Sequence, residues 1–255
     1  MLFRSHGVDS EYVTWLDIYP NPTDTLTLIP FLKDMERHMS FKYKNIVADA
    51  GYESEENYVF LEKNGQVGYI KPQNYELSKK RNFRNDISKR ENMDYDPDAD
   101  TYTCRKGRIL KAVSKSTDRT ATGYCREVTI YECENCRRCP YKKACIKGNN
   151  CKTAFKDRKK KLTVSRKLEE KRAECLERIT SEFGTQLRMN RSIQAEGSFA
   201  NVKEDMNFRR YLYRGKENVL AQSTLLAIGF DINKLHHKIM SKRTGTHLFE
   251  LKKVS

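Results

Sequence analysis

Residues 46–58 read IVADAGYESEENY, and this stretch decides how the rest of the chain is interpreted. A short apolar run, typical of a buried strand, ends on the charged side chain of Asp49. A turn of small residues follows, and Ser54 with two glutamates behind it is typical of a helix start. A carboxylate in this position either begins the turn or is held there to bind a metal ion. The local sequence leaves both interpretations open.

The segments around this stretch alternate between strand and helix patterns. Residues 11–19 are rich in aromatic and β-branched side chains, which favours a strand, and a helix is expected over about 23–39. A second helix should span about 54–65, and residues 66–71 should form another strand. This alternation predicts an α/β fold with partly parallel strand pairing.

The regular alternation stops after residue 72. The chain is then polar and basic to about residue 150, with short β-like pieces, which predicts a small β-rich insertion. Helices are expected over about 164–189, 192–205 and 216–240, and the last is apolar nearly all round, which predicts that it is buried. The expected division is 1–72 for the first part of a core, 73–160 for the insertion, 161–240 for the helical part of the core, and 241–255 for a tail.

The composition points to a polyanionic partner. The 255 residues include 49 Lys+Arg against 34 Asp+Glu, a formal net charge of +15, and nucleic acid is the usual partner of such a chain. An acidic membrane surface is the alternative, but no long apolar span or basic amphipathic anchor supports it. The N-terminus lacks a secretory pattern, so we expect a cytoplasmic protein whose cysteines are thiols or metal ligands.

Four closely spaced cysteines in the insertion form a C-x2-C-x2-C-x5-C pattern. They are Cys133, Cys136, Cys139 and Cys145. Thiolates at this spacing can chelate one tetrahedral zinc ion and stabilise a unit that is too small for a core of its own. An iron–sulfur cluster and a set of free thiols are the alternatives.

A second candidate carboxylate lies in residues 188–216, RMNRSIQAEGSFANVKEDMNFRRYLYRGK. Glu196 is early in an expected helix, and Lys203 follows on nearly the same face. Glu196 alone decides nothing, since glutamate near a helix start is favourable in any case. The basic residues around it are Arg188, Arg191, Arg209, Arg210, Arg214 and Lys216.

Taken together, four stretches resemble transposases of bacterial insertion sequences of the DDE type: VADAGYESEENY, YIKP, CENCRRCPYKKAC and RSIQAEGSFANVKEDMNFRRYLYRGKENV. The resemblance implies an RNase H-like mixed sheet flanked by helices, with a cysteine-rich insertion. It implies that Asp49 and Glu196 are the second and third acidic residues of the catalytic triad, and that Lys203 contacts DNA. The basic residues around Glu196, the five arginines and Lys216, are further candidates for DNA contact. It also implies strand cleavage and transfer at element ends in the nucleoid, with Mg²⁺ or Mn²⁺ held by Asp49 and Glu196.

The resemblance has one departure, because the first aspartate of the family's triad has no clear counterpart. Asp9 falls in an expected turn, Asp17 on a strand that matches a later one, and Asp24 near a helix cap. This implies an N-terminally incomplete core and a truncated or split transposase. Such a chain would act as a homo-oligomer on DNA or with a complementing N-terminal transposase segment. A non-catalytic DNA-binding protein with a zinc-stabilised unit is the alternative.

Overall fold

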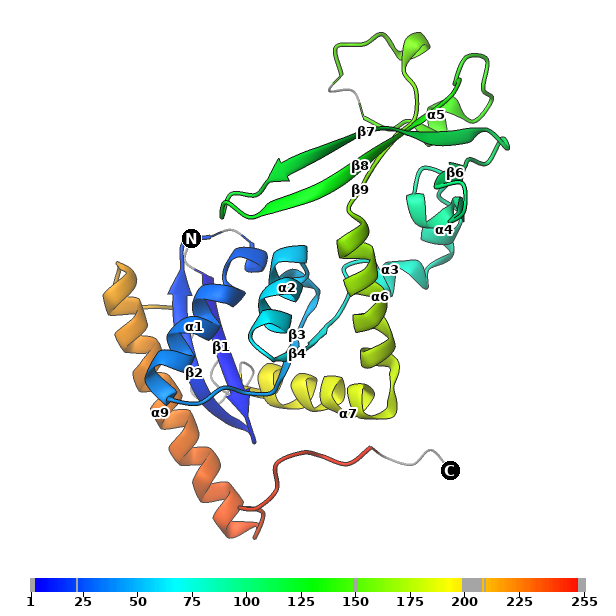
Figure 1. The fold of residues 1–255 in the computed structure, drawn as a ribbon. Helices are drawn as coiled ribbons and strands as arrows, with labels where there is room; N and C mark the ends of the chain where they lie inside the picture. The colour runs from blue at the N-terminus through cyan, green and yellow to red at the C-terminus, as the bar shows by residue number, and fades with distance from the viewer. Residues whose placement is uncertain (1–2, 22, 149–150, 199–207, 209, 252–255) are drawn as a thin grey trace. The chain divides into compact units, whose positions relative to one another are not determined.

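The computed structural model describes residues 3–21, 23–148, 151–198, 208 and 210–251. The chain divides into two compact units (Figure 1). Unit 1 comprises Met1–Pro72 together with Glu174–Ser255, and unit 2 comprises Gln73–Ala173. Within the described ranges, no helix has the length and hydropathy needed to cross a membrane.

Unit 1 contains two separate two-stranded sheets. Strand β1 (Phe3–Asp9) pairs antiparallel with β2 (Tyr12–Tyr19), and β3 (Asn45–Ala48) pairs parallel with β4 (Val67–Ile70). The expected strands at 11–19, 46–48 and 66–71 are confirmed by β2, β3 and β4. Strand β1 was not predicted. The mixed α/β class expected from the sequence is confirmed.

The N-terminal helices of unit 1 follow the predicted capping. The expected helix at 23–39 is a 3₁₀ turn, η1 (Asp24–Leu26), followed by α1 (Leu28–Met39). Helix α2 (Glu55–Lys63) begins as predicted, since the Ser54 hydroxyl accepts a hydrogen bond from the backbone N–H of Asn57 at 3.1 Å. The buried Asn57 side chain donates to the carbonyls of Thr25 and Tyr52, so it fastens η1 to the turn after β3.

The prediction of one long helix over 164–189 is wrong. The segment contains β9 (Lys161–Val164), α6 (Arg166–Thr180) and α7 (Glu182–Arg191). The break falls at Ser181, whose backbone is extended and whose hydroxyl accepts from the Gly184 N–H at 3.1 Å. Such a local cap competes with continuation of the helix. Helix α7 leads directly into a π-helical turn, η5 (Ser192–Glu196), and the predicted helix beyond residue 198 lies outside the described residues.

Helix α9 (Lys216–Met240) has the predicted bounds, but the prediction that it is buried is wrong. It packs on β2, and its buried residues are Val219, Ser223, Phe230 and Lys238. The opposite face is exposed. Apolar residues all round a helix indicate that both of its faces are buried. They do not indicate whether both faces are buried by the same chain.

Unit 2 is built on a five-stranded antiparallel sheet in the order β5-β6-β7-β8-β9. The strands are β5 (Asp94–Asp96), β6 (Thr101–Thr103), β7 (Ile109–Arg119), β8 (Cys125–Cys133) and β9. Its short helices are α3 (Tyr75–Ser78), α4 (Arg81–Arg84), η3 (Arg90–Asn92), α5 (Lys142–Cys145) and η4 (Phe155–Asp157). A core cluster that includes Leu110, Tyr131 and Cys133 packs on this sheet. Because β9 pairs with β8, residues 161–164 belong to unit 2, whereas the sequence-based division placed them with the C-terminal helices.

Candidate active site

Asp49 lies directly after β3, and its carboxylate accepts a hydrogen bond from the backbone N–H of Gly51 at 2.9 Å. A second acidic residue, Asp24, comes close to the same turn. A Cβ atom on Gly51 would lie 2.8 Å from Asp24 Oδ2 and 3.1 Å from Asp49 Oδ1, so the glycine permits both carboxylates to approach. Burial, and then the negative charge of Asp49, raise the pKa of Asp24. The end of β3 therefore carries two neighbouring acids.

Glu196 is presented by the π-helical turn η5 at the end of α7. The Ser192 hydroxyl donates to Glu196 Oε2 at 3.1 Å, which orients the carboxylate from within the same turn. Single π-helical turns occur frequently at functional sites, because the wider turn redirects a side chain.

Arg191 joins the two predicted acidic residues. Its Nη2 lies 3.1 Å from Asp49 Oδ2 and its Nη1 lies 3.6 Å from Glu196 Oε1. One guanidinium thus lies between a carboxylate at the end of a strand and a carboxylate on a helical turn far away in the sequence. The structure brings Asp49 and Glu196 to one site, and Arg191 supplies the positive charge there.

The donor chemistry of this site suits a hard divalent ion, since Mg²⁺ prefers carboxylate oxygens. The arrangement nevertheless lacks a third acidic ligand for a cation among the residues that the structure describes. Across the described ranges, no group of three or more His, Cys, Asp or Glu side chains is placed to hold a metal ion. Because Arg191 pairs with both carboxylates, it has to turn away before a cation can take its position.

Strand β1 lies beside both segments that carry the acidic residues. The Tyr52 hydroxyl, in the turn after Asp49, donates to the Ser5 hydroxyl of β1 at 3.3 Å. His6 of β1 hydrogen-bonds the Ser198 hydroxyl, just after Glu196, at 3.0 Å. In the described part of the chain, β1 pairs only with β2, and β3 pairs only with β4. Each of these two strands therefore has an edge that no other described strand covers.

The predicted DNA-binding residues occupy different environments. Arg210 and Arg214 are exposed, whereas Lys203 and Arg209 lie outside the described residues. The remaining three contact the protein itself. Arg191 pairs with Asp49 and Glu196, Arg188 Nε donates to the carbonyl of Ile179 at 2.9 Å, and Lys216 Nζ lies 3.3 Å from a carboxylate oxygen of Asp17.

A separate pocket in unit 2 collects the four predicted cysteine ligands and one more, Cys104. All the described cysteines are free thiols. Burial, above the other causes, raises the pKa of the Cys133 thiol to about 12 and raises the pKa of Cys145, which favours neutral thiols when no cation is present. The sequence analysis did not include Cys104 in the ligand set. The sequence signal for Cys104 is the C-x-x-G pattern of residues 104–107, which follows a strand. In the structure these residues form a turn, in which the Gly107 N–H donates to the Cys104 carbonyl at 2.7 Å.

A sequence model of the transposase DDE domain matches residues 103–236, just over half of the chain. The match includes Arg191, Glu196 and the cysteines of the pocket, and Asp49 lies outside it. No curated protein and no solved structure gave a match. The chain belongs to the transposase DDE domain family. Membership implies a transposase function with DNA as the partner, and such domains in general use divalent metal ions.

Proposed function

We propose that this chain contributes Asp49 and Glu196 to a metal-dependent site that cleaves and joins DNA strands at the ends of an insertion sequence. The observation that carries the proposal is the pairing of both carboxylates with the single guanidinium of Arg191. Family membership supports Glu196, which falls within the matched residues. The assignment of Asp49 is supported by its geometry.

The residues of the site have distinct parts in this proposal. Asp49 is oriented by the Gly51 N–H, and Glu196 is oriented by the Ser192 hydroxyl. Divalent ions, when bound, would activate the attacking oxygen and stabilise the leaving oxygen of an in-line displacement. Arg191 balances the two carboxylates in the absence of such ions. Once released from them, its planar guanidinium suits a DNA phosphate, which it can contact with two hydrogen bonds.

We further propose that an additional strand completes the site. The added strand would pair with the free edge of β1 or of β3. Both edges lie beside the segments that carry Asp49 and Glu196. A strand placed there would set its side chains next to Asp49 and could bring a third carboxylate. In this proposal the strand comes from an N-terminal transposase segment, so the chain acts as one part of a split or truncated transposase. Asp24, already beside Asp49, is the competing source of the third carboxylate.

Strand cleavage with and without a complementing segment tests this proposal. We expect the chain alone to nick transposon-end DNA very weakly in Mg²⁺ or Mn²⁺, and an added N-terminal segment bearing an aspartate to restore cleavage. In the restored reaction, Asp49→Ala or Glu196→Ala should lower the rate by about a thousandfold or more, since each removes a carboxylate of the site. Glu182→Ala, which removes an exposed glutamate at the start of α7, is the matched control.

The outcomes of this assay are distinct. Restored cleavage that Glu196→Ala leaves intact would refute the active-site assignment. Robust cleavage by the chain alone that Asp24→Ala abolishes would keep the site but remove the need for an added strand. Binding of DNA without cleavage under every condition would favour the non-catalytic DNA-binding alternative.

We also propose that the cysteine pocket of unit 2 holds one zinc ion. Five thiols line a single pocket, more than the four ligands of a tetrahedral site. Among the described residues no three of them are placed to hold an ion together, so in this proposal the thiols turn toward one another when zinc binds. Cys133 is the most buried of the five, at 1% exposed, and its thiol donates to the carbonyl of Asn135, so the expected ligands are the other four. These are Cys104, Cys136, Cys139 and Cys145.

Purified protein is expected to contain about one zinc per chain, because a closed thiolate site binds the ion as part of folding. Cys139→Ser should lose the metal and make unit 2 sensitive to protease. Cys125→Ser, which changes an exposed cysteine outside the pocket, should keep both the metal and the resistance. Elemental analysis of the purified protein decides the matter: iron would indicate a cluster, and the absence of both metals would leave free thiols.

A further inference from the structure

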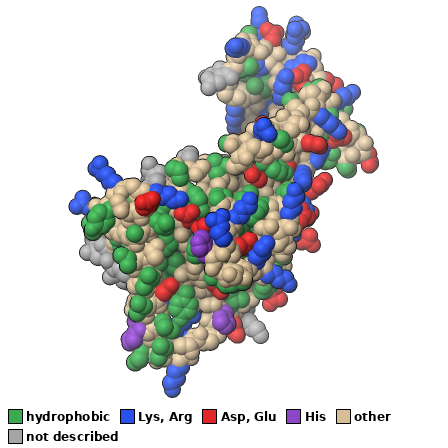
Figure 2. Space-filling model, turned by 60° about the vertical axis from the view of Figure 1, so that its left-hand side comes forward, with side chains coloured by type: hydrophobic (Ala, Val, Ile, Leu, Met, Phe, Trp, Pro, Cys, Tyr) green, Lys and Arg blue, Asp and Glu red, His purple; other side chains and the backbone are tan. Residues whose placement is uncertain are grey.

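The outer face of α9 carries a row of large aliphatic side chains that no described part of the chain covers. These residues, here called the α9 stripe, are between 46% and 70% exposed. They are Leu225, Ile228, Ile232, Leu235 and Ile239. The spacing alternates between three and four residues, the heptad pattern by which one helix packs on another. Figure 2 turns this side of unit 1 forward and shows hydrophobic side chains gathered over it.

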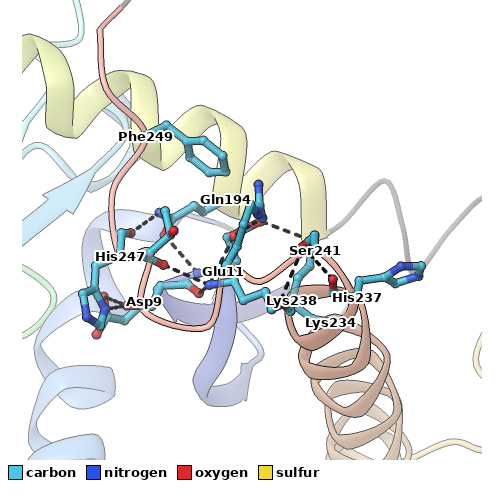
Figure 3. A network of polar contacts seen from close by, with 12 residues as sticks. Asp9, Glu11, Gln194, Lys234, His237, Lys238, Ser241, His247 and Phe249 are labelled. Carbon is cyan, nitrogen blue, oxygen red and sulfur yellow. Dashed lines mark hydrogen bonds and ion pairs between the residues drawn. The ribbon is translucent and has the colours of Figure 1, made fainter.

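The charged side chains of α9 between residues 218 and 240 point the opposite way, toward the hairpin of β1 and β2. The Val13 N–H donates to Asp231 at 2.9 Å, and Lys234 and Lys238 lie 3.4 and 3.2 Å from carboxylate oxygens of Glu11. Lys238 is only 1% exposed, and Figure 3 shows it in the polar network around Glu11. An ordinary surface helix buries its aliphatic stripe and exposes its charges. Helix α9 buries Val219 and Phe230 together with its charged side chains and leaves the aliphatic α9 stripe exposed, so its outer face resembles a contact surface.

We propose that the α9 stripe is a dimerisation surface, covered by α9 of a second copy of this chain. A stripe with a period of 3.5 residues complements another helix with the same period, and the same stripe on two copies gives a closed two-fold interface. The stripe contains no charged residue, so two chains of net charge +15 can meet there without a local repulsion. The lack of Lys and Arg in the stripe also argues against DNA as its occupant.

The proposed interface is short, which limits its strength. The stretch from Leu225 to Ile239 spans about 21 Å along the helix axis. Such a helix pair belongs at the small end of specific interfaces, so we expect a dissociation constant in the micromolar range. The inference goes beyond the proposed strand-transfer chemistry and does not depend on it.

Sedimentation equilibrium of the full chain without DNA, over roughly 1–100 μM, tests the proposal. We expect a reversible monomer–dimer equilibrium that Ile232→Glu shifts by at least tenfold toward monomer, since two charges would be buried in the centre of the interface. Asn233→Glu adds the same charge at an exposed position outside the stripe and is expected to leave the equilibrium unchanged. Far-ultraviolet circular dichroism should show that both variants remain folded.

Cross-linking provides a second readout that does not depend on affinity. Ile232 is the middle residue of the stripe, so it meets its own copy whether the two helices run parallel or antiparallel. Ile232→Cys is therefore expected to give a disulfide-linked dimer under mild oxidation that wild type and Asn233→Cys do not give. A monomer throughout the concentration range, or a dimer unaffected by Ile232→Glu, would overturn the proposal. A wild-type monomer that binds neutral phospholipid vesicles through this face would make a lipid surface the occupant instead.

Discussion

Raising the salt concentration from 50 to 200 mM is expected to weaken DNA binding by this chain about a thousandfold, if six or more phosphates are contacted. The physical reason is that each phosphate neutralised by a Lys or Arg releases condensed counterions, and the entropy of that release falls as salt rises. A chain with 49 Lys+Arg and a net charge of +15 has ample basic surface for such contacts. Fluorescence anisotropy with a labelled duplex at several salt concentrations gives the slope directly.

Single substitutions should separate binding from chemistry. Asp49→Ala and Glu196→Ala are expected to preserve DNA affinity, because they remove negative charges that a phosphate would otherwise meet. Arg210→Ala and Arg214→Ala should each lower the salt slope by about one unit where the side chain contacts a phosphate. Lys63→Ala, which removes an exposed lysine at the end of α2, is the matched control. A slope near zero would mean that the basic surface does not carry the binding.

The segment around Asp49 was predictable because its signals are local. A strand, a turn of small residues and a serine cap occur in immediate succession, and each acts over a few residues. The structure accordingly contains β3, the Gly51 turn and the Ser54 cap where the sequence placed them. Strand β1 lacks the apolar alternation that identifies a strand. It is formed through pairing with β2 across a turn at Ser10 and Glu11, two non-glycine residues with positive φ.

Long-range features of the site were not predictable in the same way. The sequence placed Arg191 among residues that contact DNA, whereas the structure shows it paired with both acidic residues. Similarly, the proximity of Asp24 to Asp49 depends on how η1 packs on the turn after β3. The apolar residues around α9 predicted a buried helix, whereas the structure shows that the described chain covers only one of its faces.

Gly184, in the connection between α6 and α7, is the position where we expect an added methyl group to destabilise the protein most. A Cβ atom on Gly184 would lie 1.9 Å from the carbonyl oxygen of Arg178 and 2.9 Å from the Cα of Ile179. Both are backbone atoms, so no side-chain rotation can relieve the overlap, and the two helices would have to separate. Gly184→Ala is therefore expected to lower the free energy of unfolding of unit 1 by about 3 kcal/mol, roughly a hundredfold in the folding equilibrium.

Urea denaturation of Gly184→Ala beside Gly197→Ala measures this effect against a matched control. A Cβ on Gly197 meets nothing within 4 Å, and its backbone is helical, with φ of −62°. Gly197→Ala is thus expected to be neutral, or to stabilise by up to about 1 kcal/mol through its higher helix propensity. Since α7 positions Arg191 and leads into the turn that carries Glu196, loosening the connection should also reduce cleavage in the complemented assay. Equal stabilities of the two variants would show that α6 and α7 do not meet as closely at Gly184 as the structure places them.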